Sequence, residues 1–110
     1  VQRDAGALYA TGTRILAYLK ENPDKIKLAR RFFTYYLDTA AKLLARYVDF
    51  QNTGLHSAEV TDILQKTAEA LPVLNKAFEK QFTHLMQGEL LDVEADIELL
   101  KSTLKMEGGK

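Results

Sequence analysis

The stretch from Asn22 to Gly54 reads NPDKIKLARRFFTYYLDTAAKLLARYVDFQNTG and decides the fold class. Between its proline and its final glycine lie about thirty residues with nearly unbroken seven-residue spacing. Two apolar sets recur at this spacing: Ile26, Phe33, Ala40 and Tyr47, and then Ala29, Tyr36, Leu43 and Phe50. The pattern predicts a helix over 23–52 that packs against other helices. We expect this helix to be the central rod of the fold.

Local signals mark both ends of that helix. Asn22 is a candidate N-cap, Pro23 suits a first helical turn, and Asp24 complements the helix dipole. Gly54 is suited to a left-handed terminating position. The sequence therefore predicts sharp boundaries on either side of the long helix.

Three further segments have helical periodicity. The first covers 5–21, with Leu8, Ile15 and Leu19 on one face. The second covers 57–87 and begins at a Ser57 cap. Pro72 interrupts it, and we expect a kinked but continuous helix there. The apolar pattern changes phase near Gly88, which favours a break and a final helix over 92–106 capped by Asp92.

Together these segments predict an all-α fold in one domain over residues 1–110. We expect an elongated antiparallel three-helix bundle, or four helices if the chain breaks near Gly88. The charges favour pairing between the two halves of the chain. Residues 1–55 carry nine basic and five acidic side chains, whereas residues 56–110 carry six basic and ten acidic ones. Helices from the two halves should therefore attract one another.

Composition excludes several classes of function. The chain has no cysteine, so it offers neither a disulfide nor a thiol nucleophile. Its 15 basic and 15 acidic residues argue against nucleic-acid binding, which favours a concentrated basic patch. No apolar run is long enough to span a membrane. Because the chain begins with Val1, we expect it to be a fragment of a longer protein.

The two histidines and the acidic cluster are weak candidates for chemistry. His56 lies in a polar turn, where a solvated side chain is expected. His84-Leu85-Met86-Gln87-Gly88 has the histidine-to-glycine spacing of a histidine phosphotransfer motif, with Gln87 in place of the usual lysine. The carboxylates at 89, 92, 94, 96 and 98 lack the Glu-x-x-His pattern of bundle metal sites and are expected to form a solvated acidic face. We therefore predict no metal and no cofactor.

A second apolar stripe lies beside the heptad positions of the 23–52 helix. Five residues define this candidate interaction surface: Leu28, Arg31, Phe32, Tyr35 and Thr39. The resulting apolar arc is wider than one neighbouring helix requires. Contacts with two neighbouring helices would account for it, and so would a surface for a protein partner or a second copy of the chain.

Several of these residues resemble a known family. Tyr35-Tyr36-Leu37-Asp38-Thr39, followed by Lys42-Leu43-Leu44, is similar to the core motif of the XpaC-like family. Pro23-Asp24-Lys25-Ile26 and the segment from Asp92 to Gly108 resemble it too. The resemblance covers roughly 15–108 and departs at Asp38, where proline is expected. Members are known as 5-bromo-4-chloroindolyl phosphate hydrolysis proteins and are distantly similar to TelA-type tellurite-resistance proteins.

The resemblance implies a bacterial protein with hydrophobic segments before this domain, and hence a cytoplasmic domain tethered to the membrane. It supplies no catalytic residues. Our leading hypothesis is a non-catalytic module that binds a protein partner or a second copy through helix–helix contacts. The alternatives are hydrolysis of phosphate esters, with Arg31, Tyr35 and Asp38 as the residues to test, and phosphotransfer through His84.

Overall fold

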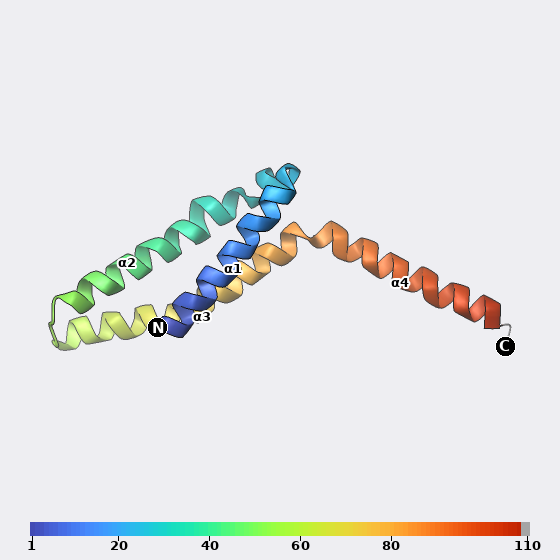
Figure 1. The fold of residues 1–110 in the computed structure, drawn as a ribbon. Helices are drawn as coiled ribbons and strands as arrows, with labels where there is room; N and C mark the ends of the chain where they lie inside the picture. The colour runs from blue at the N-terminus through green and yellow to red at the C-terminus, as the bar shows by residue number, and fades with distance from the viewer. Residues whose placement is uncertain (109–110) are drawn as a thin grey trace.

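The computed structural model describes residues 1–108, which are almost entirely helical (Figure 1). The α-helices are α1 (Gln2–Glu21), α2 (Asp38–Asn52), α3 (Ala58–Leu85) and α4 (Gln87–Gly108). Between α1 and α2 lie a 3₁₀ segment, η1 (Pro23–Ala29), and a π-helical segment, η2 (Phe32–Leu37). The molecule measures 73 × 32 × 16 Å. The prediction of an elongated all-α fold is confirmed.

The central helix is α3. Helix α1 runs parallel to α3 and packs against it, while α2 returns antiparallel along another side of α3 (Figure 1). One prediction therefore fails: the 23–52 segment is not the central rod, because both α1 and α2 pack on α3. The count of three bundle helices is not confirmed either, because the 23–52 segment is divided and α4 projects away from the other helices.

The core lies where α1, η1, η2 and α2 meet α3. Its buried apolar residues are Leu8, Ile15, Leu19, Ala29, Phe32, Ala40, Leu71, Leu74, Phe78 and Leu85. Gly12 lies on the buried face of α1, where a Cβ atom would stand 3.6 Å from the ring of Phe78. An alanine here would therefore make an ordinary van der Waals contact with Phe78. A hydrogen bond from the Thr11 hydroxyl to Asn75 Oδ1, 2.9 Å long, also joins these two helices.

The irregular segments explain why the heptad pattern predicted burial only in part. A 3₁₀ helix has three residues per turn and a π-helix has i to i+5 hydrogen bonds, so each shifts the phase of the side chains that follow. Ala29 and Ala40 are buried as expected, but Ile26 is half exposed and Phe50 is 40% exposed. Phe32, outside the predicted seam, is instead completely buried.

The helix ends agree with the predictions in three places and differ in two. Ser57 caps α3 by accepting a hydrogen bond from the Val60 amide, Gly54 has a φ of 69°, and α3 continues through Pro72. The Asn22 side chain, however, donates to the carbonyl of Tyr18 and so closes α1 instead of capping η1. The chain breaks at Met86, so α4 begins at Gln87 and not at Asp92.

Candidate functional site

An exposed aromatic and basic surface lies over η1, η2 and the start of α2. The guanidinium carbon of Arg31 lies 5.2 Å from the ring centre of Tyr35 and 5.9 Å from that of Tyr36. The two tyrosine rings meet edge to face, with centroids 5.0 Å apart. Cation–π contacts of this kind contribute about 0.5–1 kcal/mol at exposed sites. Arg31 therefore contacts both tyrosine rings and favours this arrangement of their side chains.

Four of the five residues predicted for the interaction surface are exposed or partly exposed around this cluster. Leu28 and Tyr35 are each 51% exposed, Arg31 is exposed, and Thr39 is partly buried. We call Leu28, Arg31, Tyr35 and Thr39 the aromatic–basic surface. The fifth residue, Phe32, is completely buried and packs edge-on against Phe78. Phe32 therefore belongs to the core, and its assignment to an exposed surface is corrected.

The π-helical segment coincides with the aromatic motif. It spans Phe32 to Leu37 and so contains both Tyr35 and Tyr36. Phe32, at the start of this segment, lies in the core, whereas Tyr35 is half exposed. π-Helical turns occur frequently at functional sites. The local backbone thus supports the choice of this surface as a candidate site.

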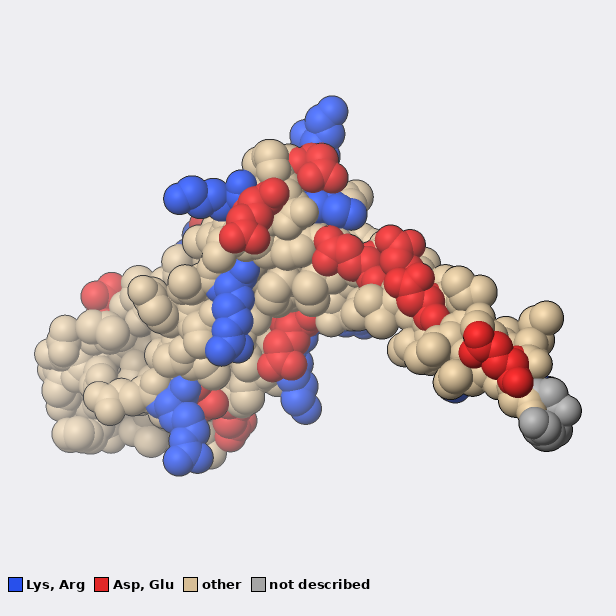
Figure 2. All heavy atoms as spheres, turned by 45° about the vertical axis from the view of Figure 1, so that its right-hand side comes forward, with Lys and Arg blue, Asp and Glu red and all other residues tan. Residues whose placement is uncertain are grey.

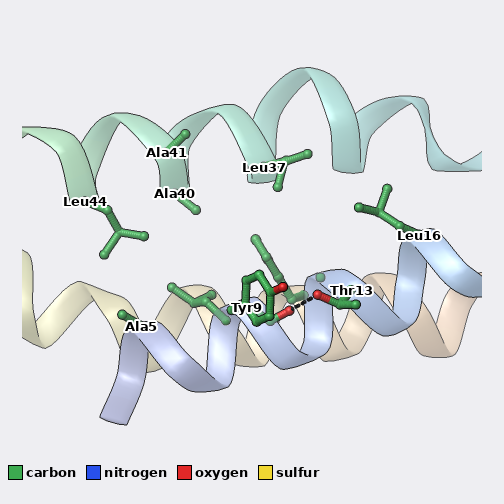
Figure 3. A pocket seen from close by; sticks show the side chains of 11 residues that line it. Ala5, Tyr9, Thr13, Leu16, Leu37, Ala40, Ala41 and Leu44 are labelled. Atoms are coloured by element: carbon green, nitrogen blue, oxygen red, sulfur yellow. Dashed lines mark hydrogen bonds between the residues drawn. The ribbon is translucent and has the colours of Figure 1, made fainter. Parts of the chain in front are cut away.

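An apolar groove that we did not predict lies between α1 and α2 (Figure 3). Both helices pack on α3 but diverge from one another, which leaves a space of about 280 Å³ above Phe78. The α1–α2 groove is lined by Ala5, Leu8, Tyr9, Gly12, Thr13, Leu16, Leu37, Ala40, Ala41, Leu44 and Phe78. The sequence did carry a signal for this groove. A second stripe of α1 lies beside its predicted core face and contains Ala5, Tyr9 and Leu16.

Helix α4 carries a second unpredicted feature, an apolar seam without an intramolecular partner. None of its residues is buried. We define the α4 seam as Leu90, Val93, Ile97, Leu100 and Leu104, which recur at alternating spacings of three and four residues and are between 46% and 58% exposed. The sequence showed this periodicity, but it could not show that α4 leaves the bundle.

Contacts at the first turn of α4 link it to α1. The hydroxyl of Tyr18 donates a hydrogen bond to Glu89 Oε1 and lies 3.4 Å from the carbonyl oxygen of Leu85. The hydrogen bond to Glu89, with burial and the nearby negative charge, raises the pKa of Tyr18 to about 12. Tyr18 therefore joins the end of α1 to the junction between α3 and α4.

The remaining candidate residues are exposed. His56 lies in the turn before α3, and His84 lies on the last turn of α3. His84 lines a shallow hollow with Lys80, Thr83, Gln87, Leu90, Leu91 and Glu94. The acidic residues of α4 are exposed, with Glu89 bonded to Tyr18, and across residues 1–108 no three His, Asp or Glu side chains are grouped to hold a metal ion. Within the same residues, no helix has the length and apolarity needed to cross a membrane.

The fold and its exposed surfaces define a small helical module, and comparison with known proteins identifies its family. Residues 1–100 match the model of the 5-bromo-4-chloroindolyl phosphate hydrolysis protein family, and the chain belongs to that family. It is similar to Protein XpaC of Bacillus subtilis (strain 168), with 28% identity over 92 residues. This match covers 84% of the chain but 45% of that relative, so the chain spans less than half of its length.

No solved structure shows significant similarity to the chain. The predicted membership of the XpaC-like family is confirmed. A relationship with the TelA-type proteins stays a prediction.

Proposed function

We propose that the chain is a non-catalytic interaction module that binds a helix of a protein partner through the aromatic–basic surface. The observation that carries this proposal is the arrangement of Arg31 over Tyr35 and Tyr36 beside the half-exposed Leu28. Tyrosine and arginine are enriched at the energetic centres of protein interfaces. A side-chain cluster ordered in the free protein also loses little conformational entropy on binding.

The test is site-specific photo-crosslinking in the bacterial host. A photoreactive phenylalanine analogue replaces Tyr35 in one chain and the exposed Gln65 of α3 in a control chain. The proposal predicts one discrete adduct from position 35 and none of that mass from position 65. It further predicts that adding Leu28→Glu or Arg31→Ala removes the adduct while the circular dichroism spectrum is unchanged. Equal adducts from both positions, or none from position 35, would overturn the proposal.

In this proposal the module is the cytoplasmic part of a membrane-linked protein, tethered by a preceding segment. The resemblance to the XpaC-like family is the support for the tether. Fractionation of cells that express the full-length gene product tests it. Release of that product by high salt, without detergent, would count against a hydrophobic tether.

Hydrolysis of phosphate esters is the second candidate, and the description of the family is the observation that favours it. The residues to test are Arg31, Tyr35 and Asp38, of which Asp38 pairs with Lys42 at 2.9 Å. We expect no turnover of 5-bromo-4-chloroindolyl phosphate by the purified chain, with or without Mg²⁺ or Zn²⁺. Turnover that is lost on Arg31→Ala, Tyr35→Phe or Asp38→Asn would favour the enzyme instead.

Phosphotransfer through His84 is the third candidate. Its support is the spacing of the motif and the exposure of the imidazole at the end of α3. Incubation with a low-molecular-weight phosphodonor such as acetyl phosphate, followed by mass spectrometry, tests it. An acid-labile phosphate on His84 that is lost in His84→Gln would establish it.

A further inference from the structure

Within residues 1–108, the α4 seam and the α1–α2 groove are apolar surfaces of similar length that no other element covers. The α4 seam from Leu90 to Leu104 spans about 21 Å at 1.5 Å per residue. The α1–α2 groove extends along α1 from Ala5 to Leu16, about 17 Å by the same rise. The groove is lined largely by apolar and small side chains, with Phe78 as part of its floor. A helix with a narrow apolar stripe therefore fits the groove in both length and chemistry.

A chain cannot fill its own groove with α4. Only Met86 separates α4 from α3, and α4 leaves the bundle in a direction away from the groove (Figure 1). Its first turn is also held to α1 by the hydrogen bond between Tyr18 and Glu89. Antiparallel helix pairs need a connection of about two to five residues. Any α4 helix in the groove must therefore come from another molecule.

The charge distribution favours docking of α4 on the bundle of a second copy over pairing between two α4 helices. Residues 87–108 carry six acidic and two basic side chains, a net charge of −4. Residues 1–86 carry twelve basic and nine acidic ones, a net charge of +3. Figure 2 shows the acidic row along α4 and the basic side chains over the bundle. Docking α4 on a partner bundle is attractive, whereas two α4 helices side by side repel one another.

We propose that α4 of each copy lies in the α1–α2 groove of a second copy, in a two-fold symmetric dimer. This inference rests on the proposed interaction role, and it names a second copy of the chain as the partner at a surface separate from the aromatic–basic one. Two seams and two grooves would bury on the order of 2,000 Å² in total, if each surface contributes about 500 Å², and this lies within the range of stable interfaces. When each copy places its α4 in the groove of the other, both apolar surfaces are buried, and the two-fold symmetry closes the assembly at two copies.

The absence of cysteine from the chain makes disulfide trapping a direct test. One preparation carries Ala41→Cys at the groove, and three others carry Val93→Cys, Ile97→Cys or Leu100→Cys in the α4 seam. Upon mild oxidation, the proposal predicts that the Ala41→Cys chain forms a disulfide-linked dimer with at least one seam variant. The control is Val73→Cys, an exposed position on α3, which should not link to the seam variants.

Two outcomes would overturn the proposal of an exchanged α4. Seam variants that link to themselves but not to Ala41→Cys would show pairing between α4 helices and overturn the proposal. A monomer by sedimentation at concentrations up to 1 mM, on the scale of weak interactions, would overturn it as well. Leu100→Glu should weaken dimerisation at least tenfold and leave the helical content unchanged, because Leu100 is exposed in the single chain.

A further variant separates this inference from the proposed function. Leu28→Glu alters the aromatic–basic surface and lies outside the groove and the seam. It should remove the adduct from position 35 and leave dimerisation unchanged, whereas Leu100→Glu should weaken the dimer and leave that adduct. Failure of one proposal is therefore distinguishable from failure of the other.

Discussion

The ring of Phe32 packs edge-on against the ring of Phe78, with centroids 5.0 Å apart and planes at 77°. Both side chains are at most 1% exposed. This pair fixes the irregular η2 segment on the central helix α3, and it lies at the middle of the core. The stability of the fold should therefore depend strongly on it.

We expect Phe32→Ala and Phe78→Ala each to lower the free energy of unfolding by about 3–5 kcal/mol, because each leaves a cavity in the core. Urea denaturation measures this change. The half-exposed Tyr35→Ala is the matched control and should cost no more than about 1 kcal/mol, the contribution of its cation–π contact with Arg31. The double variant should show a coupling of about 0.5–1.5 kcal/mol, the contribution of an edge-to-face pair. Additive effects would show that the rings do not interact as described.

Gly12→Ala should stabilise the protein by up to about 1 kcal/mol, because alanine favours the helical state more than glycine does. The added methyl group would lie 3.6 Å from Phe78 Cε2, an ordinary van der Waals contact. Gly54→Ala provides the contrast. Its φ of 69° is unfavourable for a residue with a side chain, and the change should cost about 1–2 kcal/mol. Thermal melts of the two variants should thus shift in opposite directions.

Pro72→Ala should raise the free energy of unfolding by about 1–3 kcal/mol. Pro72 lies inside α3, where it has no amide to donate to the preceding turn, and a proline in a helix interior costs about 3 kcal/mol. Its side chain is exposed, so the substitution removes little packing. A loss of stability would instead show that a bend at Pro72 is needed to bury both Leu71 and Leu74.

Tyr18→Phe should release α4 from its fixed direction. Spin labels on Lys20→Cys and Lys101→Cys, both at exposed positions, report the distance between the end of α1 and the middle of α4. The distance distribution should broaden in Tyr18→Phe and stay narrow in the control Tyr9→Phe. An unchanged distribution would mean that packing alone holds α4.

The hydrogen bond between Tyr18 and Glu89 also predicts that the direction of α4 depends on pH. Folding raises the pKa of Tyr18 from about 10 to about 12, so its protonated form is favoured in the folded protein. The contribution of this hydrogen bond to stability is therefore complete below pH 10 and is lost as the pH rises towards 12. The distance distribution of the parent chain should broaden over that interval, whereas Tyr18→Phe should show no such transition.

The sequence predicted the helical class and several helix ends because their signals are local. Ser57 and Gly54 act through their own backbone and the next turn, which a single sequence reveals. The identity of the central helix depends on long-range packing. The predicted seam on 23–52 assumed a regular α-helix, but this segment contains 3₁₀ and π turns, and Phe32 lies in the core and not on the expected surface.

The candidate surfaces were predicted only in part, because some of their contacts are local and others depend on long-range packing. Arg31 and Tyr35 are four residues apart, and this spacing brings their side chains together on a helix. The α1–α2 groove depends instead on how far two helices diverge on α3, which periodicity does not determine. The α4 seam was visible as a heptad pattern, but whether it is covered depends on the single residue Met86 at the break.

The separate packing of α1 and α2 on α3 has a consequence for cooperativity. Because the two flanking helices interact mainly through α3, detachment of α1 would leave the α2–α3 hairpin with much of its own packing. Such a molecule opens in separate units, the least stable of which exchanges its amide hydrogens first. Opening of α1 alone would expose Ile15 and the side of Phe78 that faces Gly12 without global unfolding.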